Sequence, residues 1–314
     1  MINTYKPEGR LLASPENREY FASESALMRA MSEGKILESI ALYCEDKGDG
    51  KVLSFNLGKM RGIMPKSEVE YNKTCGETKD IAIITRVGKA VCFKIIGFSE
   101  VDGEKVAVLS RKEAQRECME NFLFTLCSGD IIDATVTHLE PFGAFLDIGC
   151  GIVSLMSIDC ISVSRISHPR DRFYTGMQIK AAIKNIDYET GRIYMTHKEL
   201  LGTWSENAGE FSVGQTVSGI VRSIEPYGIF VELAPNLAGL AEYRDDIYAG
   251  QNAAVYIKNI IPEKMKVKLV IVDTFPSPET REKCFDYKIE AGHIDRWIYS
   301  PEECARVIET DFEA

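Results

Sequence analysis

Two segments of this 314-residue chain repeat nearly the same pattern, 85 positions apart. In each, a Glu-Pro turn is followed by an aromatic residue, glycine, one variable residue, phenylalanine, an aliphatic residue and a carboxylate. The first copy covers 140–147 and the second covers 225–232. A repeat of this length indicates one small domain used twice. We therefore expect tandem binding rather than catalysis in a single pocket.

Composition narrows the class of protein. Hydrophobic content of 45% and charged content of 27% are typical of soluble globular chains, and the length suits two or three domains. No apolar run approaches the roughly 20 residues of a membrane helix, and the N-terminus lacks a secretory signal. Nine cysteines without a Cys-x-x-Cys pair indicate free thiols in a reducing compartment. We expect a cytoplasmic protein without a membrane contact or a metal site.

The motifs of enzymes are missing from the sequence. There is no His-Glu-x-x-His, no Gly-x-Ser-x-Gly and no phosphate loop ending in Gly-Lys-Ser/Thr. The four histidines are scattered along the chain. The sequence therefore predicts a binding protein that is not an enzyme and has no cofactor and no small-molecule substrate.

Strand-like runs come in groups of five. Residues 129–200 contain five such runs with one longer link before the fourth, which suits a closed antiparallel barrel of the oligonucleotide-binding (OB) type. The predicted fold is mainly β, with three tandem five-stranded antiparallel OB barrels, short connecting helices and a small helical C-terminal tail. The expected domains are an N-terminal arm with a short helix (1–33), a degenerate repeat (34–115), the best-matching repeat (129–200), a shortened repeat (213–273) and an acidic tail whose helix opens near Ser300-Pro301 (274–314).

Aromatic residues are expected on the outer faces of two barrels. At strand period, Ala144, Leu146 and Ile148 face the interior, whereas Phe145 and Asp147 face outward, with Phe142 nearby at the turn. The second copy places Tyr227, Phe230 and Glu232 in the same way, with Ile229, Val231 and Leu233 inside. Exposed aromatic pairs on a barrel can stack unpaired bases. The alternative is that each Phe packs under a neighbouring segment.

Local charge can still attract RNA although the chain carries a net charge of −10. The long link of the middle repeat is basic, and two further cations lie on its last two strands. The candidate phosphate-binding residues are Arg165, His168, Arg170, Arg172, Lys184 and Arg192. The alternative for the link is a solvated loop.

The first repeat differs from the other two. Alignment puts Lys51 and Ser54 at the positions of the paired aromatics, and Phe55 falls on the inward face. This barrel is expected to contact protein, or phosphates only.

The combined pattern resembles the RNA-binding repeat of the ribosomal protein S1 family. The match rests on the Phe/Tyr-Gly-x-Phe segments, on 165–170 with Gly176, and on Asn185-Ile-Asp187 followed by Gly191-Arg-Ile193; it covers roughly 25–273. The whole chain is similar to the short, clostridial-type members of that family. The resemblance implies binding of single-stranded RNA or mRNA, with a first repeat that docks on the small ribosomal subunit.

The resemblance also implies site residues. Family members bind RNA through two aromatics, a histidine, an aspartate and an arginine. The aligned residues of the middle repeat are Phe142, Phe145, Ser157 (a departure from histidine), Asp187 and Arg192. Those of the last repeat are Tyr227, Phe230, Glu242, Ile261 and Lys266. Because a carboxylate at Glu242 would repel phosphate, the last repeat should bind RNA more weakly.

Two other functions remain open from the sequence. One is an RNA-binding regulator of decay or gene expression that never joins ribosomes. The other is a protein-interaction scaffold whose barrels have lost RNA binding, which the acidic net charge and the changes at Ser157 and Glu242 favour.

Overall fold

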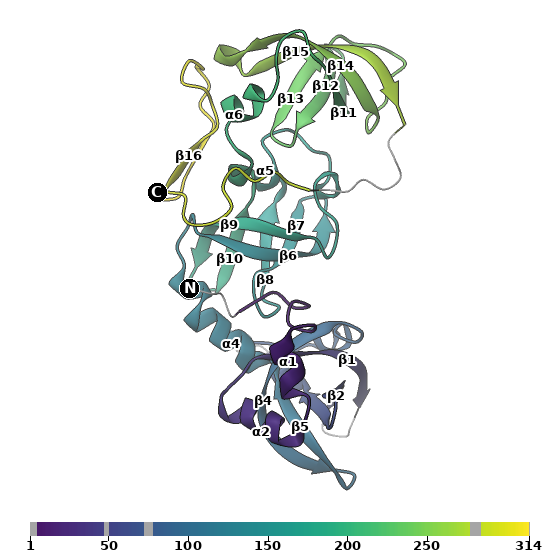
Figure 1. The fold of residues 1–314 in the computed structure, drawn as a ribbon, viewed down its shortest axis with the longest axis vertical. Coiled ribbons are helices and arrows are strands. Elements are labelled where there is room, and N and C mark those ends of the chain that lie inside the picture. The colour runs from purple at the N-terminus through teal and green to yellow at the C-terminus, as the bar shows by residue number, and fades with distance from the viewer. Residues whose placement is uncertain (1–4, 47–49, 72–77, 277–283, 314) are drawn as a thin grey trace.

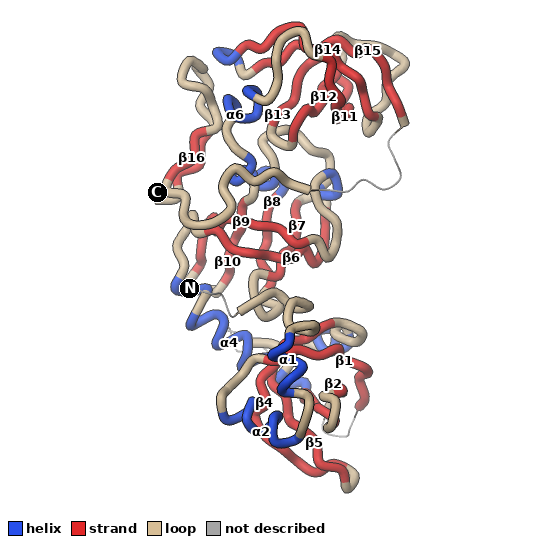
Figure 2. The backbone as a smooth tube through the Cα atoms, in the orientation of Figure 1, coloured by secondary structure: helices blue, strands red, loops and turns tan. Residues whose placement is uncertain are grey.

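The chain forms three closed five-stranded sheets stacked along one axis (Figure 1). The structure is a computed structural model that describes residues 5–46, 50–71, 78–276 and 284–313. The prediction of a mainly β protein is confirmed, and strands dominate all three bodies (Figure 2). Each barrel also contains one parallel strand pair, which the prediction of antiparallel barrels missed.

The first barrel has the strand order β1-β2-β3-β5-β4. Its strands are β1 (Leu37–Asp46), β2 (Lys51–Asn56), β3 (Arg61–Pro65), β4 (Ala90–Val101) and β5 (Glu104–Ser110), and its helices are α1 (Pro15–Tyr20), α2 (Glu24–Ser32), η1 (Lys66–Glu68) and α3 (Asp80–Ile84). The Ser23 side chain accepts a hydrogen bond from the Ala26 amide, which explains where α2 begins. Phe55 lies in the barrel core as predicted, with 1% of its surface exposed.

The middle barrel follows the connector α4 (Arg111–Asn121) and η2 (Leu123–Thr125). Its strand order is β10-β8-β7-β6-β9. The strands are β6 (Ile131–Glu140), β7 (Gly143–Asp147), β8 (Val153–Ser157), β9 (Gln178–Asp187) and β10 (Arg192–Thr196), and α5 (Ile158–Ile161) and η3 (Pro169–Asp171) lie in the link before β9. The predicted inward residues Ala144, Leu146 and Ile148 are fully buried.

The last barrel repeats this design with a shorter link. It follows η4 (Lys198–Leu201) and α6 (Trp204–Gly209), and its order is β11-β12-β13-β15-β14. The strands are β11 (Thr216–Glu225), β12 (Gly228–Ala234), β13 (Leu237–Ala241), β14 (Asn252–Ile261) and β15 (Lys266–Phe275), with η5 (Pro262–Lys264) between the last two. Ile229 and Val231 are fully buried, and Leu233 is partly buried.

The C-terminal tail contradicts the predicted helix. It forms the two-stranded sheet β16 (Arg296–Ile298) and β17 (Glu309–Asp311), and the described tail residues contain no helix. The segment runs along the middle and last barrels (yellow in Figure 1). Trp297 and Tyr299 enter the last barrel's core cluster, and the Tyr287 hydroxyl accepts a hydrogen bond from the Lys180 amide of the middle barrel. These contacts to both barrels hold the tail in an extended form.

The repeated glycine has a steric cause. A Cβ atom at Gly143 would lie 2.3 Å from the carbonyl oxygen of Met156, and one at Gly228 would lie 2.5 Å from that of Ala241. Any larger residue at these positions would push apart the two strands that follow the turn. The glycine therefore lets the aromatic turn sit close to the third strand of each barrel.

Candidate nucleic-acid interface

Two aromatic pairs stand at equivalent hairpin tips with nearly the same geometry. The rings of Phe142 and Phe145 are 6.0 Å apart and meet at 89°. Those of Tyr227 and Phe230 are 6.1 Å apart and meet at 88°. The tip residues are open to solvent, with 55% of Phe142 and 68% of Tyr227 exposed, and both strand phenylalanines are half-buried. The structure thus brings each predicted pair together on an accessible surface.

A row of outward residues surrounds Phe145 in the middle barrel. His138 on β6 and Leu155 on β8 lie directly opposite it on the neighbouring strands. Tyr194 on β10 pairs in turn with Leu155, about 10 Å from Phe145 across two strand spacings. A bulge in β6 between Val136 and His138 turns the histidine onto this face. The row combines three rings with an apolar side chain.

The last barrel has the corresponding row with a different chemistry. Ser223 and Leu240 flank Phe230, and Lys268 pairs with Leu240. Lys268 is exposed and takes the place that Tyr194 has in the middle barrel. Lys266 lies two residues earlier on the same face of β15 and is also exposed. This face therefore replaces one ring by positive charge.

The predicted exposure of the strand carboxylates is wrong. Asp147 is 3% exposed and Glu232 is 5% exposed. Asp147 accepts hydrogen bonds from the backbone amides of Glu8, Gly149 and Gly151. Its burial, together with the nearby Glu8 charge, raises the pKa of Asp147 to about 7. Each carboxylate is covered by a segment that precedes its own barrel in sequence.

The prediction that Arg172 binds phosphate is also wrong, because Arg172 pairs with Glu232. The Arg172 guanidinium donates to both Glu232 oxygens, at 3.0 and 2.7 Å, and also to Ser162 Oγ and to the Pro235 carbonyl. Arg172 is 3% exposed. It joins the link of the middle barrel to the last barrel and is not available to phosphate.

The other cations of the link take separate positions. Arg165 reaches toward Glu225 at 3.8 Å, with 86% of its side chain exposed. His168 accepts a hydrogen bond from the Arg170 amide through Nδ1 and so begins η3, and Arg170 is exposed. Of these residues, Arg165 is the one directed at the last barrel's aromatic hairpin, since Glu225 starts that turn.

The strand residues predicted for the middle barrel fall into two groups. Arg192 is exposed on β10, two residues from Tyr194 on the same outward face. Asp187 pairs with Arg192 across the turn, but its oxygens accept from the Glu189 and Thr190 amides. Lys184 points elsewhere, with its Nζ 3.1 Å from Cys160 Sγ on α5. Only Arg192 extends the aromatic row directly.

The sequence did not identify three members of these rows, namely His138, Tyr194 and Lys268. Ser157, which aligns with the histidine of the S1 repeat, lies opposite Gly143. The histidine beside Phe145 is instead His138 on β6. His138 Nε2 lies 2.6 Å from Glu140 Oε1. Tyr194 and Lys268 could have been found from the alternation of β10 and β15, which places them on the outward face.

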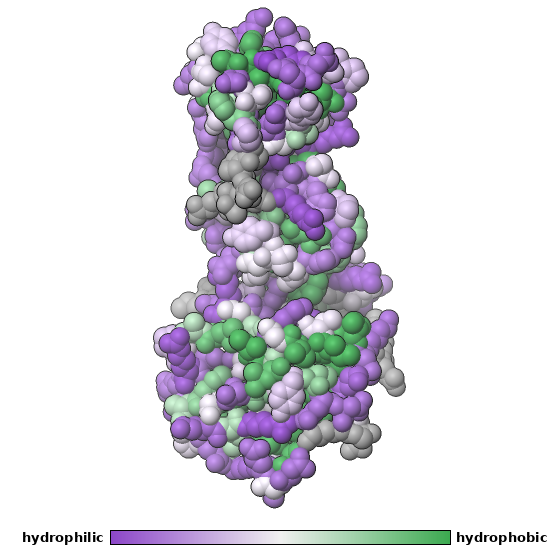
Figure 3. Space-filling model, turned by 90° about the vertical axis from the view of Figure 1, so that its right-hand side faces the viewer, coloured by the Kyte–Doolittle hydropathy of each residue, from purple (hydrophilic) through white to green (hydrophobic). Residues whose placement is uncertain are grey.

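The first barrel has a different outer surface. At the positions equivalent to the aromatic rows of the other barrels, Tyr43 on β1 pairs with Ser54 on β2. The Arg61 guanidinium lies over the Tyr43 ring, 5.8 Å from its centroid. Apolar side chains gather on this barrel in the space-filling view (Figure 3). Among its exposed large hydrophobic residues are Ile40, Leu42, Ile81, Ile84, Val87 and Ile96. This surface lacks a stacking pair at the equivalent positions.

Comparison with known proteins agrees with this geometry. The S1 RNA-binding domain family matches residues 126–198, which is the middle barrel. The small ribosomal subunit protein bS1 of Staphylococcus aureus (strain COL) is 29% identical over 291 residues, covering 87% of this chain and 71% of the relative. The middle barrel is thus similar to S1 RNA-binding domains, and most of the chain is similar to bS1 proteins. The bS1 protein of Rhizobium meliloti is 31% identical over 54% of this chain and 28% of its own length.

One of the similar solved structures spans most of this chain. It is a multidomain protein with nucleic-acid-binding domains from Streptococcus pneumoniae, with 14% identity, 79% of this chain and 75% of that chain covered, and a TM-score of 0.24. In the described parts of the chain, none of the helices is both long and apolar enough to cross a bilayer.

Proposed function

We propose that this protein binds single-stranded RNA through the outer face of its middle barrel and acts in translation at the small ribosomal subunit, in the cytoplasm. The last barrel provides a second, weaker RNA surface. The S1 match to the middle barrel and the bS1 relatives support this assignment. No catalytic step is part of it.

The observation that carries the proposal is the recurrence of one aromatic pair. Two edge-to-face pairs with ring separations of 6.0 and 6.1 Å stand at equivalent tips of two barrels. Large rings left accessible at the same repeated position of two barrels are typical of a binding surface rather than of an ordinary solvent-exposed turn. Bases that lack a pairing partner can cover such rings and contribute about 1–3 kcal/mol each.

Filter binding with poly(U) at several salt concentrations tests the RNA assignment. The folded protein should bind at low salt and lose affinity as salt rises, because phosphate contacts release counterions. Phe142→Ala should weaken this binding. The matched control is Tyr248→Ala, which should bind like the wild type, since Tyr248 is 67% exposed but lies outside both pairs. Folded wild-type protein without affinity at low salt would refute the proposal.

The ribosomal role is assigned to the first barrel, whose exposed apolar side chains suit a protein partner. Leu42→Ser combined with Ile81→Ser should reduce co-sedimentation with small subunits while leaving poly(U) binding intact. If the wild-type protein binds RNA but never co-sediments with small subunits, the alternative of a non-ribosomal regulator of RNA decay or gene expression would be favoured. Loss of both properties in a folded variant would contradict the division of roles between barrels.

A further inference from the structure

A basic groove has lining residues that contact both aromatic hairpins. It lies beside α5 and has a volume of about 360 Å³. Three cationic side chains line it, each from a different part of the chain: Arg165 from the link, Lys198 from η4 and Arg306 from the C-terminal tail. Such convergence of positive charge from three segments is unexpected in a chain with a net charge of −10.

One end of the groove touches the middle barrel's aromatic tip. Ile158 lines the groove, and its amide donates a hydrogen bond of 2.9 Å to the carbonyl oxygen of Phe142. The other end reaches the last barrel's tip. Arg165 lies 3.8 Å from Glu225, and Glu225 pairs with Gly228 around the turn that carries Tyr227. Lining residues of the groove therefore contact the hairpins that carry both pairs of rings.

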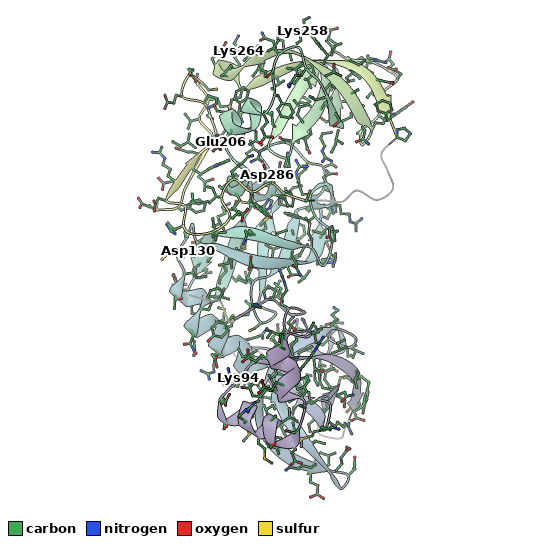
Figure 4. The ribbon with its side chains drawn as sticks, in the orientation of Figure 1. Lys94, Asp130, Glu206, Lys258, Lys264 and Asp286 are labelled. Carbon is green, nitrogen blue, oxygen red and sulfur yellow. The ribbon has the colours of Figure 1, made fainter. Side chains whose placement is uncertain are left out.

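The positive charge of the groove is only partly neutralised. Asp159 lines the groove, and Lys184 and Lys198 are among the groups that lower its pKa, after a hydrogen bond from Ser157. Arg306 is exposed and has no ion pair within the described residues. Lys258 and Lys264, by contrast, lie at the far end of the last barrel (Figure 4). Charge for a crossing phosphate chain is thus available at the joint itself.

We infer that one RNA strand passes from the middle barrel to the last barrel over this groove, with its phosphates held by Arg165, Lys198 and Arg306. The inference rests on the proposed function and adds a linking site to it. The tail, acidic as a whole, supplies one of the three cations and so becomes part of the RNA path. The bases on either side of the crossing would stack on the two aromatic pairs.

Two RNA lengths and two tail variants test this inference. An oligonucleotide of about 5 nucleotides fits one barrel, and one of about 20 nucleotides can cover both. Arg306→Ala should weaken binding of the long RNA about threefold to tenfold and lower its log–log salt slope by about 0.7, while the short RNA binds as before. Arg296→Ala is the matched control, because this tail arginine pairs with Glu309 outside the groove.

The outcomes separate this inference from the proposed function. A long RNA that binds wild-type protein and Arg306→Ala equally well would overturn the linking site, and so would an equal loss for both lengths. If Phe145→Ala still weakens binding in that case, the middle-barrel function stands alone. Wild-type protein that binds neither RNA would overturn both proposals together.

Discussion

Phe145 and Leu146 are neighbours in sequence with opposite surroundings. Phe145 faces outward beside Phe142, and Leu146 is fully buried in the middle barrel. Strand alternation was enough to predict this difference, because one face of each strand must fill the barrel. Alternation did not predict that Asp147, two residues later, is buried. The group that covers Asp147 is the amide of Glu8, 139 residues earlier, and no local pattern carries that contact.

Substitution of these two neighbours should separate binding from stability. We expect Phe145→Ala to reduce RNA affinity by about 1–3 kcal/mol, because it removes a stacking surface. Leu146→Ala should lower the free energy of unfolding by about 2–5 kcal/mol, because it opens a cavity in the core. RNA titration and chemical denaturation of both variants measure the two effects. Similar behaviour of the two variants would contradict the observed strand register.

His138 and Ser223 hold the same position in the two aromatic rows. The His138 ring lies 6.2 Å from the Phe145 ring and widens the aromatic surface beside the middle pair, whereas serine offers no ring. We expect His138→Ser to weaken RNA binding by up to about 1–3 kcal/mol, because it removes one ring from the row. RNA titration of both proteins measures this effect, and equal affinities would exclude His138 from the interface.

At the scale of elements, the links between barrels carry as much information as the barrels. Arg165 and Arg172 belong to one basic loop and look alike in sequence, yet 86% of the first side chain is exposed and only 2% of the second. The difference arises because Arg172 meets Glu232 of the next barrel, 60 residues later. The strands and barrels could be predicted from local pattern, but the contacts between modules could not.

The Arg172–Glu232 pair should stabilise the joint between the middle and last barrels. Arg172→Ala removes one of the two arginines that pair with this buried carboxylate, and because Arg222 still pairs with it we expect a loss of about 3 kcal/mol, at the low end for a broken buried pair. Glu225→Gln is the matched control, because its 3.8 Å contact is to the solvent-exposed side chain of Arg165 and is worth less than about 1 kcal/mol. Denaturation curves that move equally for both variants would show that the joint does not depend on the buried pair.

At the scale of the whole molecule, both chain ends fasten barrels together. The N-terminal arm places Glu8 between the first and middle barrels, where it pairs with Arg111 of α4. The tail packs Phe285 and Tyr287 against His197 of the middle barrel. The tail was expected to form a helix because Pro and acidic residues open its last segment. Its apolar residues instead follow the surfaces of two folded barrels, which the sequence of the tail alone does not reveal.

The His197 cluster should make the whole molecule acid-sensitive. Burial lowers the pKa of His197 to about 3, whereas an unfolded histidine titrates near 6.5. The unfolded state therefore binds more protons below pH 6.5, so this contribution to stability is complete above that pH and is lost as the pH falls toward 3. The loss is about 2 kcal/mol at pH 5. Thermal unfolding between pH 5 and 8 should show a shallower dependence for His197→Gln, and an unchanged slope would contradict this origin.

RNA titration followed by residue-resolved NMR tests the central claim most directly. With single-stranded RNA, the first signals to shift should be those of Phe142 and Phe145 with His138 beside them, followed at higher RNA concentration by Tyr227 and Phe230. Signals of the first barrel should stay in place. Shifts confined to the first barrel, or an absence of shifts at the Phe142–Phe145 pair when RNA is bound, would contradict the account.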